Sequence, residues 1–465
     1  MSDLDAVLAR IDRDLDTSLA RLDEFLRFPS VSTDPRFDAG CLDAAEWVAK
    51  ALDEIGLNAR IIKTPGKPIV VGEGTPKEAR IGTASVLFYG HYDVQPPDPL
   101  DEWVSSPFEP KIHEVDGTRQ IIARGASDDK GQLLTFVEAL RAWVSVSGDI
   151  PLPVKVLFEG EEECGSPSLP AFLAEHGKEL RAQVALICDT SMWDQKTPAI
   201  STRLRGLLTE EIVVHGPDRD LHSGMFGGPA WNPIRVLSSL ISSLHNQAGS
   251  IAVDGFYSGV EELDAVTVAN WASLKFDADK FLGGIGQSSS GGEVGRSILE
   301  QVWSRPTIEI NGIIGGYTGA GTKTVIPARA SAKITCRLVG KQDPDYLRAC
   351  LHRHLSDYSP DGVRLEFLGG EGSPAIEMSV DAPAFRAAAA ALEEEWKTPA
   401  ALIGCGGSIP IVDSFKRYLG MDSLLIGFAL DDDRVHSPNE KYNVTCFHKG
   451  ARSWARILDK LAQLR

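Results

Sequence analysis

The 465-residue chain has few cysteines and no cysteine pattern. The seven cysteines are scattered and include no C-x-x-C pair, so neither a disulfide framework nor a thiolate zinc site is indicated, and the thiols fit a reducing compartment. No stretch approaches the roughly 18 apolar residues that span a bilayer, and the amino terminus lacks a basic start followed by an apolar run. We therefore expect a cytoplasmic protein with no membrane partner.

Positive charge is also scarce. Lys and Arg number 47 against 65 Asp and Glu, which gives a formal net charge of −18 and disfavours nucleic acid as a partner. Several catalytic motifs are missing: there is no H-E-x-x-H, and segment 316–323 misses the phosphate-loop spacing by one residue. Segment 406–410 lacks the glycine that a nucleophile elbow needs after its serine.

Short apolar runs are present instead, and potential metal ligands follow them. Runs 85–90, 154–158, 184–188 and 424–429 are nearly continuous in apolar residues, which is typical of strands buried on both faces. Functional groups of open α/β sheets gather beyond the carboxyl ends of such strands. The side chains that follow these runs are His91, Glu163, Asp189 and His436.

The length and the pattern indicate two domains. Amphipathic helices are expected at 4–26 and 451–464, and the middle of the chain has partly alternating strands at 207–214 and 331–339 around a helix at 231–247. We predict an α/β catalytic domain, with a mostly parallel central sheet flanked by helices, and an inserted α+β domain. The predicted boundaries are 1–203 and 374–465 for the catalytic domain and 204–373 for the insertion.

Three motifs bear on chemistry, and each has a plain structural alternative. Strand alternation places His91 and Asp93 on one side, where the acid can orient the imidazole, although a polar strand end looks the same. The adjacent acids Asp128 and Asp129, flanked by glycines, are costly to bring together unless a cation neutralises them, although a solvated turn gives the same pattern. In the glutamate run, Glu163 can bind metal while Glu162 acts as general base, unless the run is only a solvated edge.

Taken singly, Asp189 suits a loop or helix cap and His436 a surface histidine. Together the candidates balance charge, since Asp128, Glu163, Asp189 and a bridging hydroxide would offset two divalent cations and leave both imidazoles neutral. Oxygen and imidazole ligands suit zinc or manganese, with cobalt as a further possibility.

Seven segments, in their order and spacing, resemble the carnosinase-like metallopeptidases, a family that also holds aminoacylases and glutamate-releasing carboxypeptidases. The likeness is closest to the cytosolic non-specific dipeptidases. The segments are Gly90–Pro97, Gly125–Gly131, Glu162–Glu163, Leu221–Gly228, Lys323–Pro327, Gly406–Pro410 and His436–Lys441.

The resemblance implies roles for particular residues. It implies two metal sites, one formed by His91, Asp128 and Asp189 and the other by Asp128, Glu163 and His436. It also implies that Glu162 is the general base. The peptide bond that follows Asp128 is expected to be cis. It also implies that the inserted domain serves as a lid and a dimerisation domain. His222 would then reach across a homodimer interface to the neighbouring subunit's substrate, whereas the plain alternative is a turn histidine.

The resemblance further implies that Thr324, Arg337 and Ser408 contact the substrate. Arg337 could grip a carboxylate and so favour substrates with a free carboxy end, although a strand arginine in a surface ion pair is the alternative. Gly404-Cys405 stands where animal dipeptidases carry Arg-Glu, so the preferred side chains stay open.

The predicted function is hydrolysis of dipeptides by a di-metal site. Deacylation of N-acyl amino acids or carboxypeptidase action by the same residues is the nearer alternative. A dimeric binding or scaffold protein on the same fold is the more distant one.

Overall fold

The computed structural model describes residues 3–78, 84–370, 372–407 and 409–464. The chain divides into two compact units. The first comprises Met1–Thr202, Met378–Ile403 and Pro410–Arg465, and the second comprises Arg203–Glu377 and Gly404–Ile409. The sequence predicted an inserted domain over 204–373, and the corresponding part of the second unit is Arg203–Glu377. The sequence also predicted that Gly404–Ile409 belongs to the catalytic domain, whereas this segment belongs to the second unit.

The larger sheet has parallel strands at its centre and antiparallel strands toward its edges. Its order is β1, β2, β6, β3, β7, β17, β8 and β15, with β16 beside β8. Strands β6, β3, β7 and β17 are parallel neighbours, and both β3 and β7 are buried along their whole length, as their apolar runs predicted. The bounds are β1 (Arg60–Ile62), β2 (Ile69–Gly74), β3 (Val86–His91), β6 (Val154–Glu159), β7 (Val184–Ile187), β8 (Ala199–Leu204), β15 (Ile376–Glu377), β16 (Ala401–Cys405) and β17 (Asp422–Leu425).

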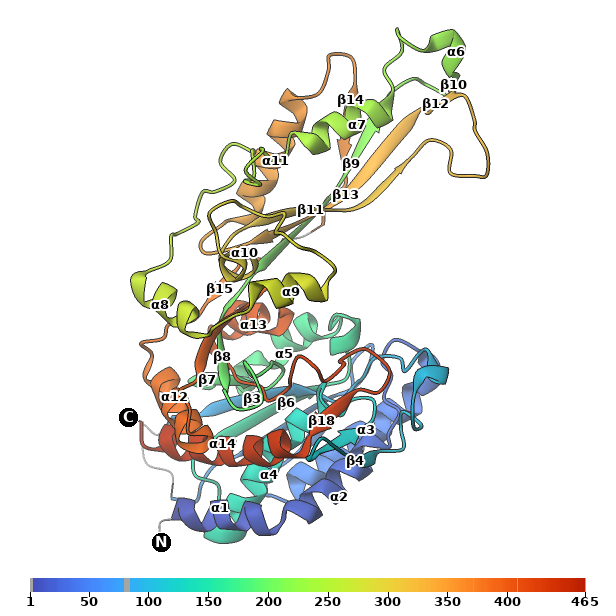
Figure 1. Cartoon of the computed structure of the whole chain (residues 1–465). Helices are drawn as coiled ribbons and strands as arrows, with labels where there is room; N and C mark the ends of the chain where they lie inside the picture. Colours follow the sequence, from blue (N-terminus) through green and yellow to red (C-terminus); the bar gives the residue numbers. More distant parts are fainter. Residues whose placement is uncertain (1–2, 79–83, 371, 408, 465) are drawn as a thin grey trace. The chain divides into compact units, whose positions relative to one another are not determined.

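Helices cover both faces of this sheet, with α4 and α14 on one side and α5 and α13 on the other (Figure 1). On the first side, Trp454 makes edge contacts with Phe88 and Phe136 in a buried aromatic cluster. No helix in the described part of the chain is both long and apolar enough to cross a bilayer. The helical bounds are α1 (Asp3–Arg13), α2 (Leu15–Leu26), η1 (Pro35–Phe37), α3 (Asp38–Asp53), η2 (Leu100–Glu102), α4 (Lys130–Ser147), η3 (Glu162–Cys164), α5 (Leu169–Leu180), α12 (Pro383–Trp396), α13 (Pro410–Ser414), η4 (Phe415–Leu419) and α14 (Val444–Ala462).

Two element predictions in this unit need correction. The opening helix expected over 4–26 is divided into α1 and α2, because Asp14 adopts a ψ of 6° that lies outside the α-helical region. The strand expected over 424–429 ends at Leu425. A small separate sheet follows in the order β18, β5, β4, and its strands are β4 (Lys111–Val115), β5 (Thr118–Ile122) and β18 (Lys441–Asn443).

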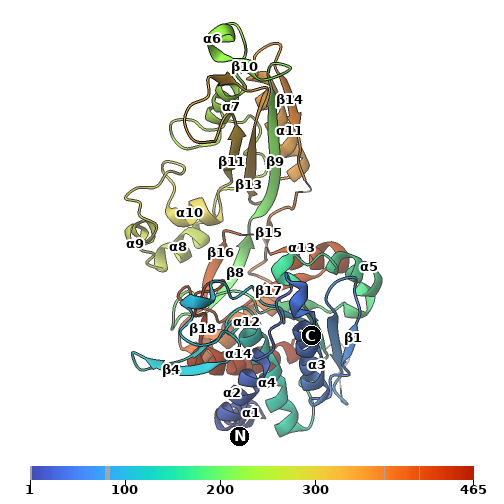
Figure 2. The same cartoon turned by 90° about the vertical axis from the view of Figure 1, so that its right-hand side faces the viewer.

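The second unit is built on an antiparallel sheet in the order β11, β13, β9, β14 (Figure 2). Alternate residues of β9 and β13 are buried against α7 and α11, which confirms the predicted one-sided strands. The helix expected over 231–247 is shorter, because Asn232 caps its start and it ends at Ser242. The bounds are β9 (Gly206–His215), β10 (Leu221–His222), α6 (Ser223–Phe226), α7 (Pro233–Ser242), α8 (Ala265–Ser273), α9 (Ala278–Gly284), α10 (Ile298–Trp303), β11 (Thr307–Gly315), β12 (Val325–Ile326), β13 (Arg329–Leu338), α11 (Pro344–Asp357) and β14 (Arg364–Phe367).

The chain returns to the second unit at Gly404–Ile409. Arg205 holds this segment, since its backbone N–H donates to the Gly407 carbonyl at 3.1 Å and its Nε donates to the Gly406 carbonyl at 2.8 Å. Gly404 packs closely on Trp303: a Cβ at position 404 would lie 2.5 Å from the Trp303 Cβ. A side chain larger than glycine is therefore disfavoured at this point.

Candidate metal centre

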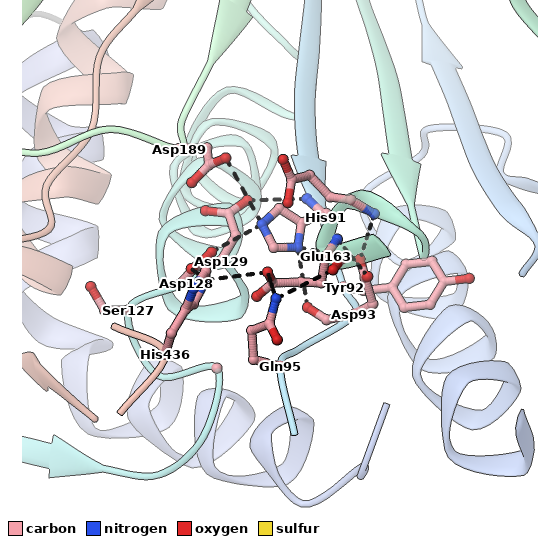
Figure 3. A network of polar contacts seen from close by, with 12 residues as sticks. His91, Tyr92, Asp93, Gln95, Ser127, Asp128, Asp129, Glu163, Asp189 and His436 are labelled. Atoms are coloured by element: carbon pink, nitrogen blue, oxygen red, sulfur yellow. Dashed lines mark hydrogen bonds and ion pairs between the residues drawn. The ribbon is translucent and has the colours of Figure 1, made fainter. Parts of the chain in front are cut away.

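Three of the predicted ligands lie beyond neighbouring parallel strands of the larger sheet. His91 is the last residue of β3, Glu163 lies in η3 after β6, and Asp189 follows β7 by two residues. Because the carboxyl ends of parallel strands open on the same edge, these side chains converge (Figure 3).

The other two predicted ligands come from loops. Asp128 lies just before α4, and its peptide bond to Asp129 is cis, as the family resemblance implied. The Asp129 carboxylate accepts the backbone N–H of His91 at 3.1 Å, which joins this loop to β3. His436 lies in the segment between β17 and β18, where its φ is +63°.

The five side chains form two groups of ligand atoms that share Asp128. The groups are His91, Asp128 and Asp189, and Asp128, Glu163 and His436, and the atoms of each group lie within 4.8 Å of one another. The His91 Nε2 is 3.1 Å from one oxygen of Asp128, and the His436 Nε2 is 3.0 Å from the other. Ligands of a tetrahedral zinc ion lie about 3.4 Å apart. The donor types and their spacing therefore fit two divalent cations that share one carboxylate.

The charges of these groups favour a bound cation. Burial, reinforced by the charge of Asp128, raises the pKa of Asp189 to about 7. Burial likewise raises the pKa of Glu162 to about 7. Hydrogen bonds to Asp128 and Glu163 raise the pKa of His436 to about 10. Divalent cations would lower the pKa of all these groups, since each ion stabilises carboxylates and neutral imidazoles around it.

Asp93 connects the histidine to the glutamate pair. The His91 Nδ1 lies 3.1 Å from the Asp93 backbone oxygen and 3.3 Å from its carboxylate, so the Nε2 is free to face a metal ion. The same carboxylate accepts the backbone N–H groups of Glu162 at 3.2 Å and Glu163 at 3.0 Å. The sequence predicted the first contact and missed the second.

Sequence reasoning also missed Gln95. Its side-chain amide donates to the Glu163 carboxylate at 2.7 Å, on the oxygen that lies 3.2 Å from the His436 Nε2. The signal was available, because residues 91, 93 and 95 share one side of an extended segment.

Three of the residues predicted to contact substrate lie in the second unit. His222 is exposed at the end of β10, and its Nδ1 accepts the Gly224 N–H at 3.0 Å. Thr324 is close by, since its carbonyl accepts the Ser223 N–H at 3.0 Å. Arg337 on β13 lines a cavity of about 660 Å³, and Ser408 lies outside the described residues.

Removal of divalent cations is expected to destabilise the first unit. An ion that binds only the folded chain stabilises it by about 4 kcal/mol per site at 1,000 times its dissociation constant. Thermal unfolding after dialysis against a chelator, and again after addition of zinc or manganese, measures this shift, with potassium chloride of equal ionic strength as the control. Identical melting curves would contradict a metal centre built from these residues.

The comparisons with known proteins identify the family of the chain. The model of Peptidase family M20/M25/M40 matches residues 87–460, and the chain belongs to this peptidase family. A relative in Candida albicans, the Cys-Gly metallodipeptidase DUG1, is 30% identical, and the match covers 94% of this chain and 92% of the relative. The human Beta-Ala-His dipeptidase is 29% identical, with 99% and 93% covered.

A solved structure shows the same fold. The M20 family metallo-carboxypeptidase Sso-CP2 from Sulfolobus solfataricus superimposes with a TM-score of 0.80 at 29% identity, and the match covers 96% of this chain and 99% of that one. These findings define the class of the protein as an M20 metallopeptidase.

Proposed function

We propose that the protein is a dipeptidase that hydrolyses the amide bond of dipeptides with a free carboxy terminus. The observation that carries the proposal is the shared carboxylate of Asp128, whose two oxygens face two different histidines. The curated relatives, which are named for Cys-Gly and Beta-Ala-His dipeptides, support this substrate class. The proposed cofactors are two ions of zinc or manganese, held by His91, Asp128, Glu163, Asp189 and His436.

The chain's own residues supply the proton transfers of this mechanism. Bound divalent ions would polarise the scissile carbonyl and lower the pKa of a water molecule. Glu162 takes a proton from the attacking water and returns it to the leaving amine. Asp93 accepts the backbone N–H groups of Glu162 and Glu163, which fixes the backbone that carries this base.

Residues of the second unit would bind the rest of the substrate. The planar guanidinium of Arg337 can donate two hydrogen bonds to a terminal carboxylate. Thr324 and Ser408 are proposed as further substrate contacts. His222 would stabilise the oxyanion in the neighbouring subunit of a homodimer, a contribution of about 3–4 kcal/mol in the transition state.

Mixing two inactive variants tests this dimer proposal. A Glu162→Gln subunit lacks the base and a His222→Ala subunit lacks the oxyanion donor, so each homodimer is expected to be inactive. A co-expressed heterodimer, purified by two different tags, has one site with both residues if His222 acts across the interface. Recovered dipeptidase activity supports the proposal, whereas a heterodimer as inactive as its parents contradicts it.

Carboxypeptidase action is a second candidate, favoured by the similarity to the Sulfolobus metallo-carboxypeptidase. A substrate panel separates the two functions: dipeptides, longer peptides and N-acetyl amino acids, each with zinc, with manganese and without metal. We expect metal-dependent cleavage of dipeptides, with amide-capped dipeptides cleaved poorly. Faster release of carboxy-terminal residues from longer peptides would favour a carboxypeptidase, and faster cleavage of N-acetyl amino acids a deacylase. No cleavage in any arm would favour a binding protein.

A further inference from the structure

Glu440 is a buried carboxylate that no step of the proposed reaction uses. It is fully shielded from solvent. One of its oxygens accepts the Arg124 Nη1 and the Gly125 N–H, both at 2.9 Å. The other accepts the backbone N–H groups of Ser127 at 2.8 Å and Asp128 at 3.0 Å. All four bonds therefore hold the loop that ends in the shared ligand.

Asp433 bonds to the same loop. In the sequence it precedes His436, whereas Glu440 follows it. One of its oxygens accepts the Ser127 hydroxyl at 2.8 Å and the Leu430 N–H at 2.8 Å. Its other oxygen accepts the Lys441 Nζ at 2.6 Å. Ser127 is thus bonded to residues on both sides of His436, and it lies next to Asp128 (Figure 3).

The segment between these two acids has an unusual backbone. Arg434, His436 and Asn439 have φ angles of 57°, 63° and 63°. Residues other than glycine adopt this left-handed region only at a cost in free energy. Such conformations persist when surrounding contacts determine them. Here Asn439 bonds to Glu102 and Val104 at 2.8 and 2.7 Å, in addition to the bonds of the two acids.

We propose that Ser127, Asp433 and Glu440, together called the ligand clasp, are positioning residues of the metal centre. The clasp joins the loop of Asp128 to the loop of His436, so that the two ligands keep their 3.0 Å separation before any cation arrives. A ligand pair fixed in advance loses little conformational freedom on binding, which strengthens metal affinity. This inference rests on the proposed function, since it assumes that these residues bind metal.

The replacement Glu440→Gln tests the clasp. An amide nitrogen accepts no hydrogen bond, so two of the four N–H groups that bond to Glu440 would lose their acceptor. The matched control is Glu395→Gln. Glu395 is also buried, and it accepts Arg452 and Arg456 at 2.8 and 2.9 Å, but it joins α12 to α14 and contacts neither ligand loop. Both variants therefore lose a buried charge pair in the same unit, and only one of them alters the clasp.

The readouts are zinc affinity, by competition with a chromophoric chelator, and the melting temperature of the chelated protein. We expect Glu440→Gln to weaken zinc binding by about 10- to 100-fold, while Glu395→Gln lowers the melting temperature and keeps wild-type affinity. A milder variant, Ser127→Ala, removes only the hydroxyl bond to Asp433 and should weaken binding by several-fold without loss of folding.

The outcomes separate the clasp from the function on which it rests. Wild-type affinity in both Glu440→Gln and Ser127→Ala would overturn the clasp, as would an equal loss of affinity in Glu395→Gln. A wild-type protein that binds no divalent cation would overturn the proposed function itself. If Glu440→Gln does not fold, a weakened but folded Ser127→Ala still supports the clasp, and a folded Ser127→Ala with unchanged affinity overturns it.

Discussion

Replacement of Glu162 by glutamine is expected to lower turnover by about 10²- to 10⁴-fold, the range for loss of a general base. The amide keeps the size of the side chain but cannot take a proton from water. Because Glu162 belongs to neither ligand group, we expect the metal content to stay at the wild-type level. Single-turnover kinetics with elemental analysis of the same preparation measure both quantities.

Glu161→Gln is the matched control for this prediction. Glu161 is the preceding residue and is buried, but its carboxylate lies against Gly66, where a Cβ would fall 1.6 Å from its Oε1. We expect this variant to keep most of its activity. Wild-type turnover in Glu162→Gln, or an equal loss in Glu161→Gln, would rule out the assignment of the base.

Replacement of Asp128 by alanine is expected to remove both cations together. Each ligand group of the candidate centre includes this carboxylate, so its loss leaves each ion with one imidazole and one acid. We expect the affinity for each of the two cations to fall by more than about 100-fold. Replacing a residue that only hydrogen-bonds to a metal ligand lowers affinity by up to about 100-fold, and loss of the ligand itself should cost more. Turnover should be lost in parallel, since the metal centre activates both water and carbonyl.

Asp189→Ala provides the contrast, because Asp189 belongs to one group only. Its metal content should fall by about half, with the ion held by Glu163 and His436 retained. Metal analysis after dialysis against a weak chelator distinguishes the two variants. Loss of only one ion from Asp128→Ala would show that the carboxylate is not shared.

The sequence singled out the candidate ligands because their positions follow from local rules. Apolar runs identified β3, β6 and β7, and the parallel arrangement of these strands brings His91, Glu163 and Asp189 to one edge. Asp128 was recognisable because neighbouring acids between glycines are costly without a cation. The family resemblance then grouped these residues with His436.

The parts that sequence reasoning missed depend on contacts between distant segments. Glu440 follows no apolar run, and its role appears only when the 125–128 loop folds against it. The break between α1 and α2 was also missed, since the apolar periodicity continues through Asp14 although its ψ of 6° lies outside the α-helical region. Periodicity reports which side of a helix is buried, and it does not report where the backbone dihedral angles leave the α-helical region.

The return of the chain at Gly404–Ile409 bears on how the second unit could be exchanged among related proteins. A transplanted segment covering Arg203–Glu377 alone would place Arg205 and Trp303 against the recipient's own residues in place of the Gly404, Gly406 and Gly407 that they contact here. Chimeras should therefore fold and function better when both stretches come from the same parent. In evolution, the two stretches are expected to change together even though Met378–Ile403, a segment of 26 residues, separates them in the chain.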